Sequence, residues 1–335
     1  MKLKSIVAMA LLLVSSHNNT LLAESSLGSP AASGNAVSTD YDSLIKGAFP
    51  TFQAAELESK LNTIIARSAT SLVGIDNIVI KDLEGGLKFF NLESSGERLN
   101  PNTFIGTNHD LFVNRSRGVV QMFDKRAVSK LLTDSELSLL MPKLKTQHLG
   151  MLKKVGVRDD EVLFLETAPM KVQTAKGGPS GFEKVLPAVV DEVATYVMRK
   201  SGDLLVEDSF VRLASNNERE LRMLDLRWPA LKTHTALKQM RVKSKDVLIR
   251  EIATKTRLSA AGQKIGIRMA VVLRPVLAEG KVVYIPAMKV GVMPQDGETG
   301  EIFFVDLHSE NLAYSEITPQ GRDTDVSRLV GPIGR

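Results

Sequence analysis

The feature that most constrains the fold is a run of short segments with the alternating hydrophobicity of β-strands. Residues 193–199, 204–213 and 221–227 form this run, and turns at Gly202 and Asn216 separate them. Alternation places one side of each strand against a core, and short turns connect antiparallel neighbours. The run therefore predicts an antiparallel meander.

A second run of the same kind covers residues 267–277, 282–292 and 302–307. Apolar residues at helical spacing precede each run and predict helices over 133–155 and about 244–257. The first of these helices opens with the capping-box spacing of a threonine and a glutamate. The order predicts an α+β fold of repeated helix plus antiparallel β-meander units, with the helices packed on one face of the sheets.

The N-terminal part of the chain carries weaker patterns. Apolar spacing predicts a helix over residues 52–65. Gly85 and Gly86 separate the apolar runs 78–80 and 87–92, which predicts a hairpin with a glycine turn. Residues 94–118 are polar and rich in turn-forming residues, so they predict a long surface loop.

The first 23 residues have the pattern of a secretory signal peptide. Lys2 and Lys4 precede an apolar run from Ile6 to Val14 that is too short for a stable membrane span, and Ala23 offers a cleavage site. We therefore expect export, with the protein periplasmic or secreted and without a transmembrane segment after signal removal.

The remaining chain divides at composition changes. Residues 24–43 predict a flexible leader, and residues 44–130 an N-terminal α+β unit. Residues 131–335 predict two further α+β units that end in an irregular arm.

Composition excludes several classes of function. The chain has no cysteine, which excludes a disulfide framework, a lipid-modified cysteine and thiolate metal sites. Without the two lysines of the signal peptide the net charge is +3, which is too small to predict nucleic-acid binding.

The first of these meanders resembles a known family. Residues 196–213, closed by Leu226-Arg-Trp-Pro229, are similar to the sheet of PepSY and FTP-type propeptide domains, and residues 283–289 with 304–306 resemble a further unit. The shared pattern is an aromatic strand, a glycine turn, a V-x-x-S-x-V strand and a third strand ending near tryptophan, over about a third of the chain. The resemblance implies an inhibitory, chaperone-like or binding role without catalysis, and no functional residue carries over.

No catalytic constellation is evident. The histidines after Ala23 are His109, His148, His234 and His308, which lie on different predicted elements without metal-ligand spacing, and H-E-x-x-H is absent. We expect them to be solvent-facing or capping residues, with no catalytic residue, no metal and no cofactor.

The one local feature with functional promise is charge. Residues 212–257 contain 12 basic and five acidic residues, a net charge of +7. A β-bulge between Met223 and Leu224 would place basic side chains of the third strand on one outer face. This arrangement predicts an anion-binding site formed by Arg212, Arg222 and Arg227. The alternative is a solvated basic surface that binds no ligand.

The leading hypothesis is an exported non-enzymatic binding or regulatory protein, either a PepSY-like modulator of an exported peptidase or a binder of an anionic envelope polymer. One alternative is a cell-envelope hydrolase whose site is assembled from scattered residues. Another is a surface structural or interaction protein. Partner identity and oligomeric state stay open.

Overall fold

The computed structural model describes two compact units of the chain. The first comprises described residues between 78 and 231 together with 3–5, and the second comprises 41–49 and described residues between 241 and 314. The residues described are 3–5, 41–49, 78–92, 96–115, 118–126, 132–178, 181–185, 189–231, 241–260, 265–278, 281–294, 300–309 and 314. The predicted boundary near residue 130 falls inside the first unit.

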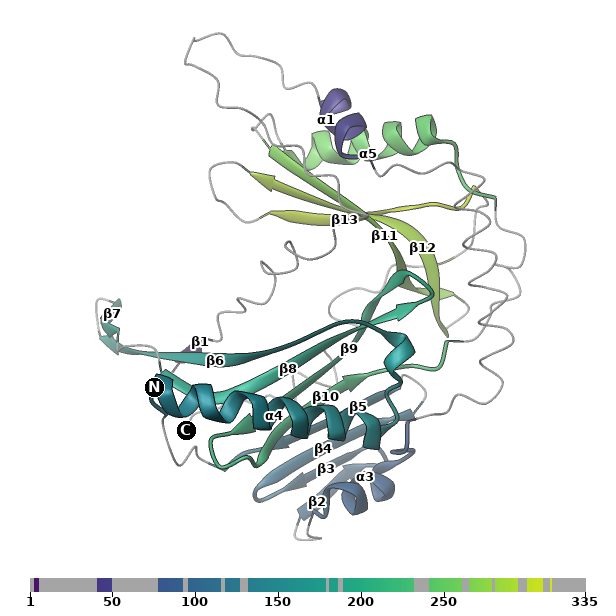
Figure 1. Ribbon diagram of the computed structural model, residues 1–335. Helices are drawn as coiled ribbons and strands as arrows, with labels where there is room; N and C mark the ends of the chain where they lie inside the picture. Colours follow the sequence, from purple (N-terminus) through teal and green to yellow (C-terminus); the bar gives the residue numbers. More distant parts are fainter. Residues whose placement is uncertain are drawn as a thin grey trace. The chain divides into compact units, whose positions relative to one another are not determined.

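The first unit is built on an antiparallel sheet with the strand order β1-β6-β8-β9-β10-β5-β4-β3-β2, and β7 pairs with β6 (Figure 1). The three strands of the predicted first meander are present, in register as neighbours. The strands are β1 (Leu3–Ser5), β2 (Gly96–Asn100), β3 (Thr103–Gly106), β4 (His109–Asn114), β5 (Val119–Asp124), β6 (Val162–Gly178), β7 (Gly181–Val185), β8 (Val189–Ser201), β9 (Leu204–Asn216) and β10 (Leu221–Arg227).

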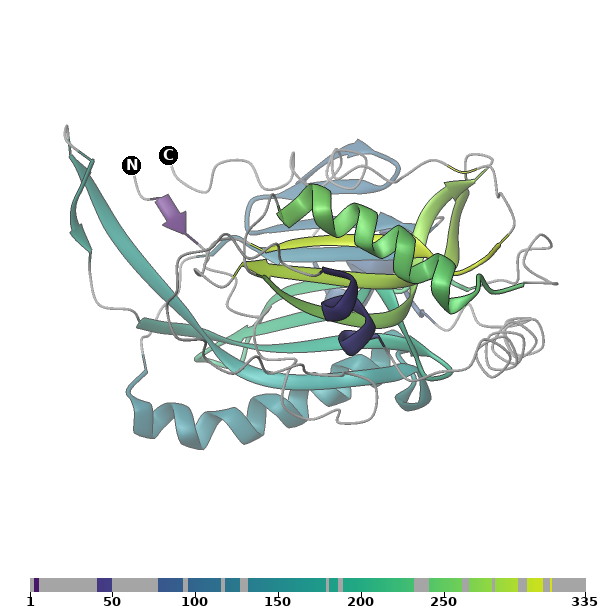
Figure 2. The same cartoon turned by 90° about the horizontal axis from the view of Figure 1, so that it is seen from above.

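Helix α4 (Asp134–Val155) lies along one face of this sheet, as Figure 2 shows. Its predicted capping box is confirmed, since Thr133 and Glu136 satisfy each other's backbone N–H groups. Its predicted end is also confirmed, because Gly156 has a φ of 98°, the left-handed conformation that glycine adopts without a steric penalty.

The core of the first unit lies between α4, α3 (Leu83–Phe90) and the sheet. Burial of this apolar surface is the main driving force for folding. The strands contribute side chains from both the central and the β2–β5 parts of the sheet, so both parts belong to one core. The buried residues are Ile80, Leu83, Phe104, Leu111, Val113, Val120, Met122, Leu152, Val155, Val157, Val197, Val211, Leu213, Leu224, Leu226 and Trp228.

The hairpin predicted around Gly85 and Gly86 is wrong, because this segment is helix α3. The Asp82 side chain caps the helix by accepting a 2.7 Å hydrogen bond from the Gly85 N–H. Gly86 is required by packing, since a Cβ there would lie 2.8 Å from Cδ2 of Leu111 on β4. Gly86 therefore marks a close helix–sheet contact and not a turn.

The loop predicted over residues 94–118 is also wrong, because it contains strands β2, β3 and β4. Its sequence is polar because these strands are short and their connections carry Asn, Thr and Gly. Tertiary pairing with β5 supplies the backbone partners that local sequence preference does not reveal.

The second unit consists of helices α1 (Tyr41–Ala48) and α5 (Lys245–Ala260) and strands β11 (Ile265–Ala278), β12 (Lys281–Pro294) and β13 (Glu301–Asp306). The strands form the predicted second antiparallel meander. Ile45, Leu248 and Ile252 are fully buried between the helices and the strands.

The predicted fold class is therefore wrong in its architecture. The chain is dominated by sheet and not by repeated units of one helix and one meander, since β5, β4, β3 and β2 extend the sheet of the first unit beyond β10. No described helix is both long and apolar enough to span a membrane. The predicted helix over 52–65 lies outside the described residues, as do the leader up to residue 40 and the signal segment apart from β1.

Candidate functional site

Arg222 is one of the three arginines that were predicted to bind an anion. It takes part in an internal ion pair. Its side chain is 6% exposed, and its Nη1 lies 2.8 Å from Oδ2 of Asp124, whose side chain is fully buried. The bulge that the sequence predicted occurs slightly earlier, with the register shift between Leu221 and Met223. Burial acts to raise the pKa of Asp124, but hydrogen bonds from Arg126 and the charge of Arg222 outweigh it and lower that pKa.

Arg212 and Arg227 lie on neighbouring strands around Asp225. Arg212 is the direct cross-strand partner of Asp225, and its Nη2 donates a 2.9 Å hydrogen bond to the sulfur of Met223. Arg227 places its Nε 3.5 Å from Oδ1 of Asp225 and its guanidinium 5.1 Å from the ring centroid of Phe210. The structure thus brings Arg212 and Arg227 together, while Arg222 belongs to the separate ion pair with Asp124.

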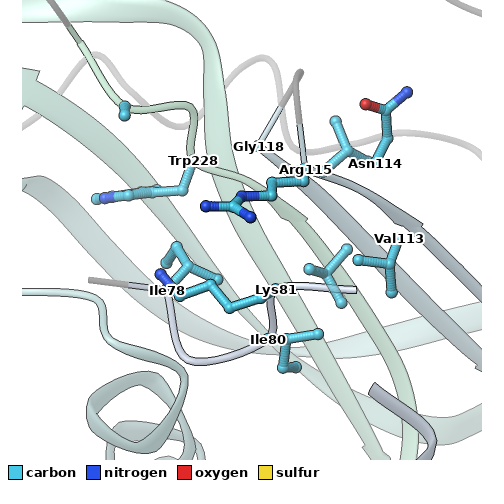
Figure 3. A pocket seen from close by; sticks show the side chains of 11 residues that line it. Ile78, Ile80, Lys81, Val113, Asn114, Arg115, Gly118 and Trp228 are labelled. Carbon is cyan, nitrogen blue, oxygen red and sulfur yellow. The ribbon is translucent and has the colours of Figure 1, made fainter. Parts of the chain in front are cut away.

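A second place where cationic side chains converge is a small pocket in the first unit, which we call the Trp228 pocket (Figure 3). Figure 3 shows the Arg115 guanidinium and the Lys81 ammonium group beneath the Trp228 ring. Its volume is about 50 Å³, which is room for a few water molecules. The lining residues are Ile78, Ile80, Lys81, Val113, Asn114, Arg115, Gly118, Val119, Val120, Trp228 and Ala230.

The backbone around Gly118 brings the walls of the pocket together. Gly118 has a φ of 61°, and its N–H donates a 3.2 Å hydrogen bond to the Arg115 carbonyl, which closes the turn between β4 and β5. The Gly118 carbonyl accepts a 2.7 Å hydrogen bond from the Trp228 N–H. The turn that carries Arg115 is therefore fixed directly to the backbone of Trp228.

The indole of Trp228 is in turn held by a half-buried charged group, the carboxylate of Glu161. Its Nε1 donates a 3.0 Å hydrogen bond to Oε2 of Glu161, and the other oxygen of Glu161 accepts a 2.7 Å hydrogen bond from Nη2 of Arg199. The Arg199 guanidinium also lies 4.8 Å from the centroid of the indole ring. The carboxylate is thus neutralised by Arg199 and supports the ring without adding a net negative charge to the pocket.

Among its described residues, the lining of the pocket contains two cationic side chains and no carboxylate. Its surface beneath the cations is aliphatic, since Ile80, Val113 and Val120 are buried. Such a site suits a small anionic group, because two nearby positive charges in a partly dry environment attract it more strongly than they would in water. This site was not predicted from the sequence, because Lys81 and Arg115 lie in separate segments that only the fold brings together.

His148 is the histidine whose position departs most from expectation, because it is fully buried and not exposed. Its Nδ1 lies 2.7 Å from Oγ1 of Thr195 on β8, and its Nε2 lies 2.9 Å from Oγ of Ser215 on β9. Burial lowers its pKa to about 4, so the ring is neutral near pH 7 and links α4 to the sheet. His234 lies outside the described residues.

Among the residues that the structure describes, no three His, Asp or Glu side chains cluster as they would to hold a metal ion. No family model and no curated protein matches the chain.

Proposed function

We propose that this chain is an exported, non-enzymatic binding protein that holds a small anionic group of its partner in the Trp228 pocket. The single observation that supports this is the convergence of Lys81 and Arg115 on one pocket whose described lining residues include no carboxylate. Arg115 offers planar donors that suit carboxylate and phosphate oxygens, and Lys81 supplies a compact charge beside it.

The three arginines that the sequence indicated lie beside carboxylates of the fold itself. Arg222 already neutralises Asp124, and Arg227 faces Asp225, so an anion would compete with internal carboxylates at both. Arg212 donates a hydrogen bond to the neutral sulfur of Met223, but it stands beside Asp225, which reduces its attraction for an anion.

The test uses the fluorescence of Trp228, the single tryptophan of the chain, which reports on the pocket directly. Titration with propionate and with sulfate should change the emission, and the apparent affinity should fall as sodium chloride is raised, because salt screens the attraction. The double variant K81Q/R115Q should bind at least about tenfold more weakly, since hydrogen bonds to charged groups contribute about 1.5–3 kcal/mol.

The matched control is K88Q/R98Q, which removes the same charge from exposed positions outside the lining. It should retain the affinity of the unmodified chain. Equal weakening in both double variants would show that the response follows net charge and would contradict a site at the Trp228 pocket.

A further inference from the structure

We infer that the outer face of helix α4 binds the surface of a bilayer that contains anionic lipids. The inference does not depend on the Trp228 pocket. It rests on the exposure of this side of the helix, on its charge and on an exposed apolar residue at one end. We call this surface the α4 outer face, and its residues are Leu139, Lys143, Lys145, Gly150, Lys153 and Lys154.

Helix α4 has one side in the core and the other side in solvent. The buried residues Leu144, His148, Leu152 and Val155 follow one another at three or four positions, so they form one stripe against the sheet. The residues of the α4 outer face are all exposed, and α4 lies on the outside of the sheet in Figure 2. A partner can therefore reach this side of the helix along its length.

Positive charge dominates the later part of α4. Residues 142–155 contain four lysines and no Asp or Glu. Nζ of Lys153 lies 3.9 Å from Oδ2 of Asp159, but these side chains are 68% and 86% exposed, so water screens the pair. Among the residues that the structure describes, Lys143, Lys145 and Lys154 have no carboxylate partner. The charge of this surface is therefore complementary to an external array of anions.

The spacing of the lysines suits a flat surface of many anionic groups. Lys143 and Lys154 are separated by about 17 Å along the helix, at a rise of about 1.5 Å per residue. Gly150 lies between them, and even a Cβ there would meet nothing within 4 Å, so no side chain projects between the lysines. Lysine stems are long enough to reach lipid phosphates while the helix lies parallel to the bilayer.

An exposed leucine distinguishes a lipid surface from a soluble acidic polymer. Leu139 is 73% exposed, and Leu140 and Met141 beside it are half-buried. A hydrated polymer offers no apolar environment for this side chain, whereas the boundary between headgroups and acyl chains does. The combination of lysines with an exposed leucine therefore favours the bilayer.

The experiment reports on contact at the helix itself. The chain has no cysteine, so Gly150→Cys in the full-length chain can carry a single environment-sensitive dye. Vesicles of phosphatidylcholine and phosphatidylglycerol in equal amounts should shift its emission to the blue, and phosphatidylcholine alone should not. The response should weaken as sodium chloride is raised, because salt screens the attraction. The same dye at Thr254→Cys, an exposed position on α5, should keep its emission.

Charge variants test the lysines in the Gly150→Cys background. K153Q/K154Q should weaken the binding of the mixed vesicles at least about tenfold, since each lysine near an anionic surface contributes about fivefold or more. The matched control is K46Q/R250Q, which removes the same charge from exposed positions on α1 and α5 and should leave the affinity unchanged. All variants must keep the Trp228 emission of the unmodified chain, which shows that the first unit remains folded.

The apolar contact is tested by Leu139→Ser. This variant should weaken vesicle binding several-fold, because it removes the side chain that enters the lipid boundary. Leu99→Ser, at a leucine of β2 that is 55% exposed, is the control and should have no effect. Soluble polyglutamate should not shift the dye at position 150.

Three results would overturn the inference. The first is an unchanged emission of the dye at position 150 on the mixed vesicles, whether or not the protein sediments with them, because α4 would then make no lipid contact. The second is an equal loss in K153Q/K154Q and K46Q/R250Q, which would assign the binding to net charge. The third is a response to polyglutamate as strong as that to vesicles, which would make an acidic polymer the partner. None of these results bears on the Trp228 pocket, so the proposed function stands or fails separately.

Discussion

The indole Nε1 of Trp228 donates a 3.0 Å hydrogen bond to Oε2 of Glu161, a residue 67 positions earlier in the sequence. The same carboxylate neutralises Arg199, which is 1% exposed and also lies over the indole ring. Glu161 therefore satisfies two buried partners at once and fixes the ring that forms one wall of the pocket.

Replacement of Glu161 by Gln should destabilise the first unit by about 3–5 kcal/mol, because it removes the carboxylate that neutralises the buried charge of Arg199. Urea unfolding followed by Trp228 fluorescence measures this loss. Asp159→Asn is the control, since its side chain is 86% exposed in the same short helical turn, η3 (Asp159–Glu161), and should change stability by less than about 0.5 kcal/mol. Similar losses in the two variants would show that Glu161 has no special role.

Two glycine substitutions in the first unit should have opposite effects. Gly118→Ala places a Cβ 2.3 Å from Cα of Pro229 at a φ of 61°, so it should cost more than about 2 kcal/mol and disturb the pocket. Gly150→Ala in α4 meets nothing within 4 Å and should stabilise the helix by up to about 1 kcal/mol. Thermal unfolding of both variants tests the pair, and a tolerated alanine at 118 would contradict the close approach of the turn to Pro229.

The predicted arginine site should separate into two classes of residue. Arg222→Gln removes one of the cations that contact the buried side chain of Asp124, and Arg126 is another. We expect the free energy of unfolding to fall by about 3 kcal/mol. Arg212→Gln removes a half-buried side chain that donates a hydrogen bond to the sulfur of Met223, and we expect a loss of stability below about 1 kcal/mol. Equal melting temperatures for the two variants would argue against the ion pair as a structural element.

Stability should depend on pH through His148. Its pKa is lowered from 6.5 to about 4 in the folded state, so the unfolded chain binds the proton more readily between these values. The contribution is complete above pH 6.5 and is lost progressively as the pH falls toward 4, by up to about 3 kcal/mol. Urea unfolding at pH 7.5 and at pH 4.5 measures the change.

His148→Gln provides the comparison, because glutamine cannot be protonated and retains polar atoms that can reach Thr195 or Ser215. This variant should be less stable at pH 7.5, where its fit to the two hydroxyl groups is poorer, but its stability should change less between the two pH values. A slope as steep as that of the unmodified chain would assign the acid sensitivity to other groups.

The fold shows which patterns in a sequence carry local information. Helix α4 was predictable because Thr133, Glu136 and Gly156 act through hydrogen bonds and backbone angles within a few residues. The two meanders were predictable because the side chains of a strand alternate between its faces regardless of what it packs against. These features need only local geometry.

The errors arose where the decisive contact is distant in sequence. Gly86 is a helix residue because Leu111 approaches it, and β2, β3 and β4 are strands because β5 offers them a sheet to join. Likewise Arg222 is a structural residue because Asp124 is buried beside it, which no local pattern could show.

The sequence by itself determined the strand and helix segments with strong local periodicity, the absence of cysteine chemistry and the concentration of basic charge after residue 212. Only the tertiary structure decided that strands from both parts of the first unit form one sheet, and that Lys81, Arg115 and Trp228 line one pocket. The physical reason is that side chains far apart along the chain acquire a common environment only when a core has formed. The charge of each residue is set by its type, but its partner is set by the fold.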